Sequence, residues 1–144
     1  FSMLGAEPLA ASFSYDLFQK QLDGTSATVK GFLLNQQRIA GIGNIYADEI
    51  CFAARIAPSC KSASLTTSEK KRLFTAIPRV LRRAIRHGGT TFRDYRDTQG
   101  KKGNFTHLLK VYGRAGKPCR RCGRTLVRTT IASRGTVSCP GCQI

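Results

Sequence analysis

Apolar residues recur at helical spacing in the first part of the chain and predict two short helices. The first spans residues 15–22, with Ser14 as its N-cap and Asp23-Gly24 at its end. The second begins after Ser26 and runs to about residue 36, with its apolar residues on one face. Residues 1–13 lack this periodicity, and we expect them to form a lead-in to the helices.

Two glycines bracket one apolar residue before a third predicted helix. Gly41 and Gly43 permit backbone conformations that other residues resist, so an irregular turn is expected around Ile42. Asn44 is then placed to cap a helix over residues 45–54, whose polar and apolar residues predict an amphipathic element. Backbone N–H groups at such a helix start favour a phosphate, but many helices begin this way and the signal alone is weak.

The clearest helical pattern begins at a capping box, Thr66-x-x-Glu69. An apolar stripe interleaved with arginines runs from there to about His87, and Pro78 is expected to kink the helix or displace one backbone bond. Residues 90–105 show almost no apolar periodicity and predict a long polar loop, which in a compact domain is usually functional or disordered. Residues 105–112 predict a β-strand that leads into the last segment.

Four cysteines near the end of the chain predict a metal site. Cys119 and Cys122 form one C-x-x-C pair, and Cys139 and Cys142 form a second, with sixteen residues between the pairs. The intervening β-rich residues 126–138 contain a turn and predict a hairpin with the metal at its open end, which is a zinc ribbon. All four ligands of a tetrahedral Zn²⁺ are supplied, so the ion is structural and not catalytic.

Disulfides and a redox-active pair are the alternatives to zinc. Paired disulfides suit a secreted chain, and a redox C-x-x-C suits a βαβ context; the sequence marks neither. Cys51 and Cys60 are neither spaced nor placed to join the metal site, and we interpret them as free thiols in a reducing cytosol.

The chain of 144 residues carries a net charge of +16, and this charge is unevenly distributed. Residues 1–66 hold five basic and five acidic side chains, whereas residues 67–144 hold the other 19 basic and only three acidic ones. A positive field of this kind beside a zinc ribbon favours a polyanionic partner over a merely solvated surface. With 41% hydrophobic residues the chain can bury a core, and neither a membrane span nor a signal peptide is recognisable.

Several motifs together resemble the formamidopyrimidine-DNA glycosylase and endonuclease VIII family. Lys30-x-x-Leu33-Leu34-x-Gln36, followed by Gly41-Ile-Gly-Asn-Ile-Tyr-Ala-Asp-Glu-Ile50, is similar to the family's helix–two-turns–helix signature. Four later motifs resemble the zinc finger of the same family: Val111-Tyr-Gly-Arg114, Gly116-x-Pro-Cys119, Arg134-Gly-Thr136 and Cys139-Pro-x-Cys142-Gln143. Leu4-Gly-x-Glu-Pro-Leu9 resembles the linker that precedes the helical domain.

This resemblance covers nearly the whole chain and implies a mainly α fold. It divides the chain into a linker remnant at 1–13, a helical DNA-binding domain at 14–107 and a zinc-ribbon finger at 108–144. The family flips a damaged nucleotide out of duplex DNA, excises oxidised bases and cleaves the strand by β,δ-elimination. It attacks the sugar with an N-terminal proline amine, in a Pro-Glu pair that opens a separate β-sandwich domain.

The departure from the family pattern is as informative as the match. The sequence opens Phe1-Ser-Met-Leu and its five prolines are internal, so the catalytic residues of the sandwich have no positions in it. The resemblance therefore implies the DNA-binding C-terminal half of a bacterial, cytoplasmic and nucleoid-associated DNA glycosylase and AP lyase. Its partners would be damaged duplex DNA and the missing catalytic domain, and this half alone is expected to be inactive.

Matching positions imply roles for individual residues. Asn44 and Arg134 resemble the family's phosphate-binding residues, and Lys30 resembles a lysine near the lesion-bearing strand; a helix cap, a turn arginine and a solvated lysine are the respective alternatives. Tyr46 and the acidic pair after Ala47 are interpreted as mainly structural. A lesion-capping loop of the oxidised-purine branch would hold Thr90, Arg93, Asp94 and Tyr95.

Two other functions fit part of the sequence. A stand-alone zinc-ribbon protein could bind nucleic acid with no catalytic half at all. A zinc-ribbon adaptor between proteins is a third possibility, but adaptors rarely concentrate so much positive charge on one half.

Overall fold

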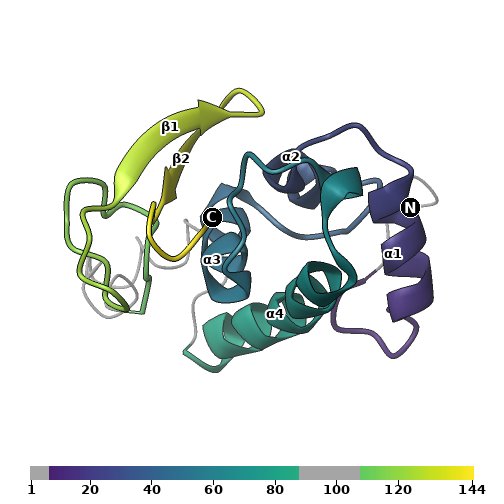
Figure 1. The fold of residues 1–144 in the computed structure, drawn as a ribbon. Coiled ribbons are helices and arrows are strands. Elements are labelled where there is room, and N and C mark those ends of the chain that lie inside the picture. Colours follow the sequence, from purple (N-terminus) through teal and green to yellow (C-terminus); the bar gives the residue numbers. More distant parts are fainter. Residues whose placement is uncertain (1–6, 88–107) are drawn as a thin grey trace.

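The computed structural model describes residues 7–87 and 108–144, in which helices come first and a hairpin last (Figure 1). The helices are α1 (Tyr15–Asp23), α2 (Val29–Leu34), α3 (Asn44–Ala54) and α4 (Thr67–Arg86), with a short 3₁₀ turn, η1 (Ser62–Ser64). The hairpin pairs β1 (Val127–Ile131) with β2 (Arg134–Ser138) in antiparallel register. The predicted mainly α fold with a C-terminal hairpin is therefore confirmed.

The first two helices start where side chains satisfy their backbone donors. Ser14 caps α1 as predicted, and Gly24 ends it. The cap of α2 was wrongly predicted to be Ser26: Thr28 accepts from the Gly31 N–H at 3.1 Å, and α2 ends at Leu34, before the predicted end. Thr28 also pairs with Lys61 in an isolated β-bridge, which keeps the chain extended until the helix begins.

The third helix is more deeply buried than its sequence pattern predicts. Gly41 lies in the left-handed region at φ +88°, in agreement with the irregular turn. The N-cap is Gly43, so Asn44 is the first helical residue and does not cap the helix. The predicted amphipathic character is wrong as well, because Asp48 and Glu49 are buried together with the apolar residues of α3. Figure 1 shows the reason: α3 lies between the other helices and the hairpin.

The fourth helix agrees with its sequence pattern. Both hydrogen bonds of the Thr66–Glu69 capping box are present, and the helix continues through Pro78 to Arg86. Leu73 and Ile77 of its apolar stripe are buried against α3. Among the described residues, no helix is both long enough and apolar enough to cross a lipid bilayer.

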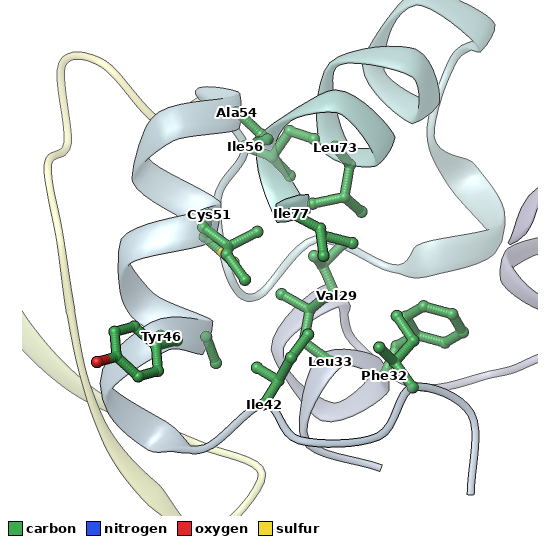
Figure 2. Packing of buried hydrophobic residues seen from close by; sticks show 14 of the residues in the cluster. Val29, Phe32, Leu33, Ile42, Tyr46, Cys51, Ala54, Ile56, Leu73 and Ile77 are labelled. Atoms are coloured by element: carbon green, nitrogen blue, oxygen red, sulfur yellow. The ribbon is translucent and has the colours of Figure 1, made fainter. Parts of the chain in front are cut away.

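Two apolar clusters meet at α3. The larger gathers side chains from all four helices, and Figure 2 shows part of it, with Val29 and Leu33 of α2 beside Ile77 of α4. The smaller cluster lies in the C-terminal segment around Val111, Leu126 and Val137, and Phe52 of α3 is inserted into it. One face of α3 therefore belongs to the core of the helices, and another to the core of the hairpin segment.

The hairpin turns through two residues with left-handed backbone, Ala132 and Ser133. Arg134, predicted to lie in the turn, is the first residue of β2 and pairs with Ile131. The strand predicted over 105–112 is wrong for residues 108–112, which form turns held by the Glu49 side chain of α3, and its first three residues lie outside the described ranges. The predicted loop at 90–105 also lies outside them.

Candidate nucleic-acid interface and metal centre

The four predicted cysteine ligands converge. The sulfur atoms of Cys119, Cys122, Cys139 and Cys142 all lie within 4.8 Å of one another. Tetrahedral Zn²⁺ with bonds of about 2.3 Å requires sulfur atoms about 3.8 Å apart. The Sγ atoms of Cys119 and Cys142 are 3.9 Å apart, and those of Cys122 and Cys139 are 3.4 Å apart, so the cluster fits one structural zinc.

Backbone donors complete the metal site. The Arg121 N–H points to Cys119 Sγ and the Cys142 N–H to Cys139 Sγ, each at 3.3 Å, which stabilises thiolate charge. Cys51 and Cys60 lie outside the cluster, as predicted. Complete burial raises the pKa of the Cys51 thiol, which keeps it protonated and inert.

Glu49 of α3 holds the segment that enters the ribbon (residues 108–144). Its carboxylate accepts from the backbone N–H groups of Lys110, Val111 and Tyr112 at 2.8, 2.9 and 2.8 Å. Burial raises the pKa of this carboxyl, and the three donors oppose that shift. The prediction that Glu49 is structural is therefore confirmed, and its function is to fix residues 110–112 on α3.

Asp48, the neighbouring acid, holds the hairpin from the same helix. Its carboxylate accepts from the Val137 N–H at 3.1 Å and forms an ion pair with Lys30 at 2.7 Å. Lys30 Nζ also donates to the Gly135 carbonyl at 2.9 Å and to Thr136 Oγ1 at 2.7 Å. Burial raises the pKa of the Asp48 carboxyl, and Lys30 opposes that shift. Three successive hairpin residues are thus held by one buried ion pair.

The structure contradicts the predicted role of Lys30 in contacting DNA, and its alternative as a solvated lysine. The side chain is completely buried, and its three N–H donors face Asp48, Gly135 and Thr136. An ammonium group has three donors, so none is left for a phosphate. Lys30 instead fixes the hairpin on α2 and α3.

Asn44 lies beside the hairpin tip. Its Nδ2 donates to the Gly135 carbonyl at 3.3 Å, and its Oδ1 accepts no hydrogen bond from the described residues. Gly135 follows Arg134, whose side chain is exposed. The fold therefore brings Asn44 and Arg134, 90 positions apart in the sequence, to one surface. Their contact with phosphate stays a prediction, and Thr90, Arg93, Asp94 and Tyr95 lie outside the described residues.

Two further contacts between the helical part and the ribbon were missed by the sequence analysis. The Arg121 guanidinium lies 4.0 Å from the centre of the Phe52 ring, and Gln143 Nε2 donates to the Ile56 carbonyl at 3.0 Å. Neither partner belongs to a periodic pattern. The only available signal was the match of Gln143 to the zinc-finger motif.

The fold and site define a helix–two-turns–helix protein with a four-cysteine finger, and comparison with known proteins agrees. Residues 4–96 match the family described as "Formamidopyrimidine-DNA glycosylase H2TH domain". Residues 116–144 match the family described as "Zinc finger found in FPG and IleRS". The chain belongs to the formamidopyrimidine-DNA glycosylase H2TH family, which confirms the resemblance noted in the sequence.

Similar proteins are bacterial formamidopyrimidine-DNA glycosylases. The protein of Desulfitobacterium hafniense strain DSM 10664 / DCB-2 is 50% identical over 141 residues, which are 98% of this chain and 52% of that protein. The protein of Acaryochloris marina is 46% identical over 140 residues, 97% of this chain and 49% of that protein. The chain spans about half the length of the curated relatives it matches.

Solved structures of this family share the fold. The MutM (Fpg) protein of Thermus thermophilus aligns with a TM-score of 0.88 at 43% identity, covering 98% of this chain and 54% of that one. The Lactococcus lactis Fpg in complex with DNA that contains an abasic site aligns with a TM-score of 0.88 at 37% identity, covering 99% and 52%.

Removal of zinc should unfold the ribbon while the larger helical core persists, because metal binding and local folding are linked. Freshly purified protein should contain one equivalent of zinc, and chelation should abolish hydrogen-exchange protection in residues 127–138. Cys122→Ser should lose the metal, whereas the matched variant Cys60→Ser should retain it. Less than half an equivalent in the unmodified protein would contradict the site.

Replacement of Lys30 by methionine should destabilise the protein by about 3–5 kcal/mol, because it leaves Asp48 buried without its ion-pair partner. Hydrogen exchange at the Val137 amide should accelerate, and chemical denaturation should give the free energy of unfolding. Lys20→Met, at an exposed position of α1, is the control and should change that free energy by less than about 0.5 kcal/mol. Unchanged stability of Lys30→Met would argue against this role.

Proposed function

We propose that this chain is the DNA-gripping C-terminal part of a glycosylase that acts on oxidised purines in duplex DNA. The observation that carries the proposal is the placement of Asn44 beside the hairpin tip that bears Arg134. The net charge of +16 supports a polyanionic partner. The Lactococcus lactis relative of the same fold is bound to DNA.

The proposed contacts of Asn44 and Arg134 with DNA are made to its phosphates. The N-terminal end of α3 carries the positive end of an 11-residue helix dipole, and Asn44 is its first residue. Arg134 adds a full positive charge, and its guanidinium fork suits a phosphodiester. Such contacts fix the register of a duplex without reading its sequence, so binding by this part of the protein is salt-sensitive and nearly independent of sequence.

The buried ion pair makes this grip rigid. Lys30 and Asp48 hold Gly135, Thr136 and Val137 against α2 and α3, so Arg134 is presented from a fixed strand. A fixed donor loses less conformational entropy on binding than a flexible one. At the other end of the hairpin the four cysteines would hold zinc, and the bound ion would tie the two strands together.

In this proposal the whole protein, and not this chain alone, carries out base excision and strand cleavage. The family's chemistry requires a proline amine next to a glutamate, and none of the five prolines in this sequence is followed by Glu. A β-sandwich domain with that pair is the proposed partner, and the bacterial nucleoid is the proposed location. Preference for oxidised purines is inferred from the match of Thr90, Arg93, Asp94 and Tyr95 to a lesion-capping loop.

Arg134→Ala should weaken binding to damaged and undamaged duplexes alike. If Arg134 contacts one phosphate, the slope of log K against log salt should become shallower by about 1. Fluorescence anisotropy over a salt series measures both quantities, with zinc content as the check on folding. Arg38→Ala is a control that removes the same charge from the segment before α3. An unchanged salt slope in Arg134→Ala would exclude the phosphate contact.

The 144-residue chain should not excise an oxidised guanine. A lysine nucleophile needs a free amine that faces a pocket, and the one fully buried lysine of the described residues, Lys30, directs its amine to Asp48, Gly135 and Thr136. The measurement is incubation with an oligonucleotide that carries one oxidised guanine, followed by borohydride trapping. A stoichiometric covalent adduct, or strand cleavage with multiple turnovers, would place an active site in this chain.

A further inference from the structure

A second group of cations surrounds the C-terminal end of α3. Two open hollows with volumes of about 680 and 710 Å³ adjoin there and share Arg55 and Arg72 in their walls. Lys71 and Arg79 line the first hollow, and Arg121 lines the second. We call this region, defined by these five residues, the α3 C-terminal cleft. Because α3 has 11 residues and rises 1.5 Å per residue, the cleft lies about 16 Å from the helix end that carries Asn44.

The positive charge of this cleft is only partly neutralised within residues 7–87 and 108–144. All five cationic side chains are exposed. The ion pairs of the described residues are Lys30–Asp48 and Lys70–Asp23, and neither involves a residue of the cleft. Glu69 bears the one side-chain carboxylate in the described walls of the two hollows, and its Oε1 accepts from the Thr66 N–H in the capping box. The zinc ligands Cys122 and Cys142 also line the second hollow, and zinc with four thiolates would add a net charge of about −2, which leaves the five cations in excess.

Two of the arginines are fixed in place. Arg72 Nε donates to the Ala54 carbonyl at 2.9 Å, and Arg121 Nη2 donates to the Phe52 carbonyl at 3.1 Å. These bonds satisfy the last carbonyls of α3, which accounts in part for basic residues at this position. Arg72 Nη1 also donates to Ser68 Oγ at 3.4 Å, and the Arg121 guanidinium lies over the Phe52 ring. A guanidinium group has five N–H donors, so Arg72 keeps three and Arg121 keeps four beyond these bonds for an anion.

The other donors of the cleft are those that bind phosphates. The hydroxyl residues Thr67, Ser68 and Thr75 line the first hollow, where α4 also begins with the positive end of its dipole. Arginine, lysine, serine and threonine provide most protein contacts to nucleic-acid phosphates. A protein partner would instead favour apolar or aromatic anchors. The described walls offer one large apolar side chain, the exposed Ile144.

From these observations we infer that the α3 C-terminal cleft binds the phosphate backbone of a second nucleic-acid segment. This inference goes beyond the proposed function, which uses the opposite end of α3. One chain then holds two DNA segments, one at Asn44 and Arg134 and the other at the cleft. The second segment binds more weakly and with a strong dependence on salt, because the cleft offers exposed charges and no buried polar contact.

A bridging experiment tests the inference. The 144-residue chain is loaded on a bead-bound undamaged duplex, and capture of a second, fluorescent duplex is measured at low salt. Lys71→Gln/Arg79→Gln removes two cations of the cleft and leaves the bonds to the α3 carbonyls intact. Lys20→Gln/Lys117→Gln removes the same charge from exposed positions that line neither hollow. Sedimentation without DNA tests whether the chain is a monomer, which is the expected result.

The unmodified chain and the control should both bridge the duplexes. The cleft variant should capture about five-fold less of the second duplex, with a salt slope for capture that is shallower by about 2, because two phosphate contacts are lost. Its affinity for a single duplex in solution, measured in excess protein, should change by less than about two-fold.

Equal bridging by the cleft variant and the unmodified chain would overturn the inference, and so would an equal loss in the control. Bridging that depends on a dimer, or a cleft that binds poly-glutamate but no second duplex, would also overturn it. The proposed function is tested separately by Arg134→Ala in the single-duplex assay. A normal single-duplex affinity in that variant, together with cleft-dependent bridging, would contradict the proposed function and leave the inference standing.

Discussion

Two adjacent carboxylates of α3 attach the zinc ribbon to the helices, and the proposed nucleic-acid interface depends on them. Glu49 binds the three backbone N–H groups that precede the ribbon, and Asp48 binds the hairpin and the ammonium group of Lys30. Residues next to each other on a helix point about 100° apart, so one helix can hold two separate parts of the ribbon. This arrangement explains why α3 carries two adjacent acidic residues and yet is buried on nearly all sides.

Charge burial of this kind is costly unless every partner is supplied. The sequence provides them from distant positions: Lys30 from α2, the Val137 amide from β2 and the amides of residues 110–112 from the connecting segment. The interface therefore forms only in one register of the hairpin, because a shift by one residue would move Thr136 and Val137 to the opposite face. The same contacts place Asn44 next to Gly135, which links the stability of the contact between helices and ribbon to its proposed use in binding.

Local signals in the sequence were sufficient for much of this fold. The capping box at Thr66, the cap at Ser14 and the spacing of the four cysteines each depend on neighbouring residues, and each was predicted correctly. The resemblance to a known family identified the architecture.

What could not be predicted depends on contacts between distant segments. The amphipathic interpretation of α3 was wrong because its polar residues face the ribbon. Lys30 was assigned to DNA from the family resemblance, and nothing nearby in sequence reveals Asp48 as its partner. The strand expected up to residue 112 failed because Glu49 takes the amides that a neighbouring strand would have used.

Phe52 shows that the two modules recognised in the sequence do not share a clean boundary in space. Its side chain arises from the helical module and completes the apolar cluster of the ribbon, where it packs with Val111, Leu126 and Val137. Exchange of the ribbon between relatives, a natural approach to altering how such proteins hold DNA, would have to carry this position of α3 with it. A chimaera joined at the boundary between the two sequence motifs would place a residue from the recipient protein in the apolar cluster of the new ribbon. For recombination and protein engineering, the transferable unit is the ribbon together with α3.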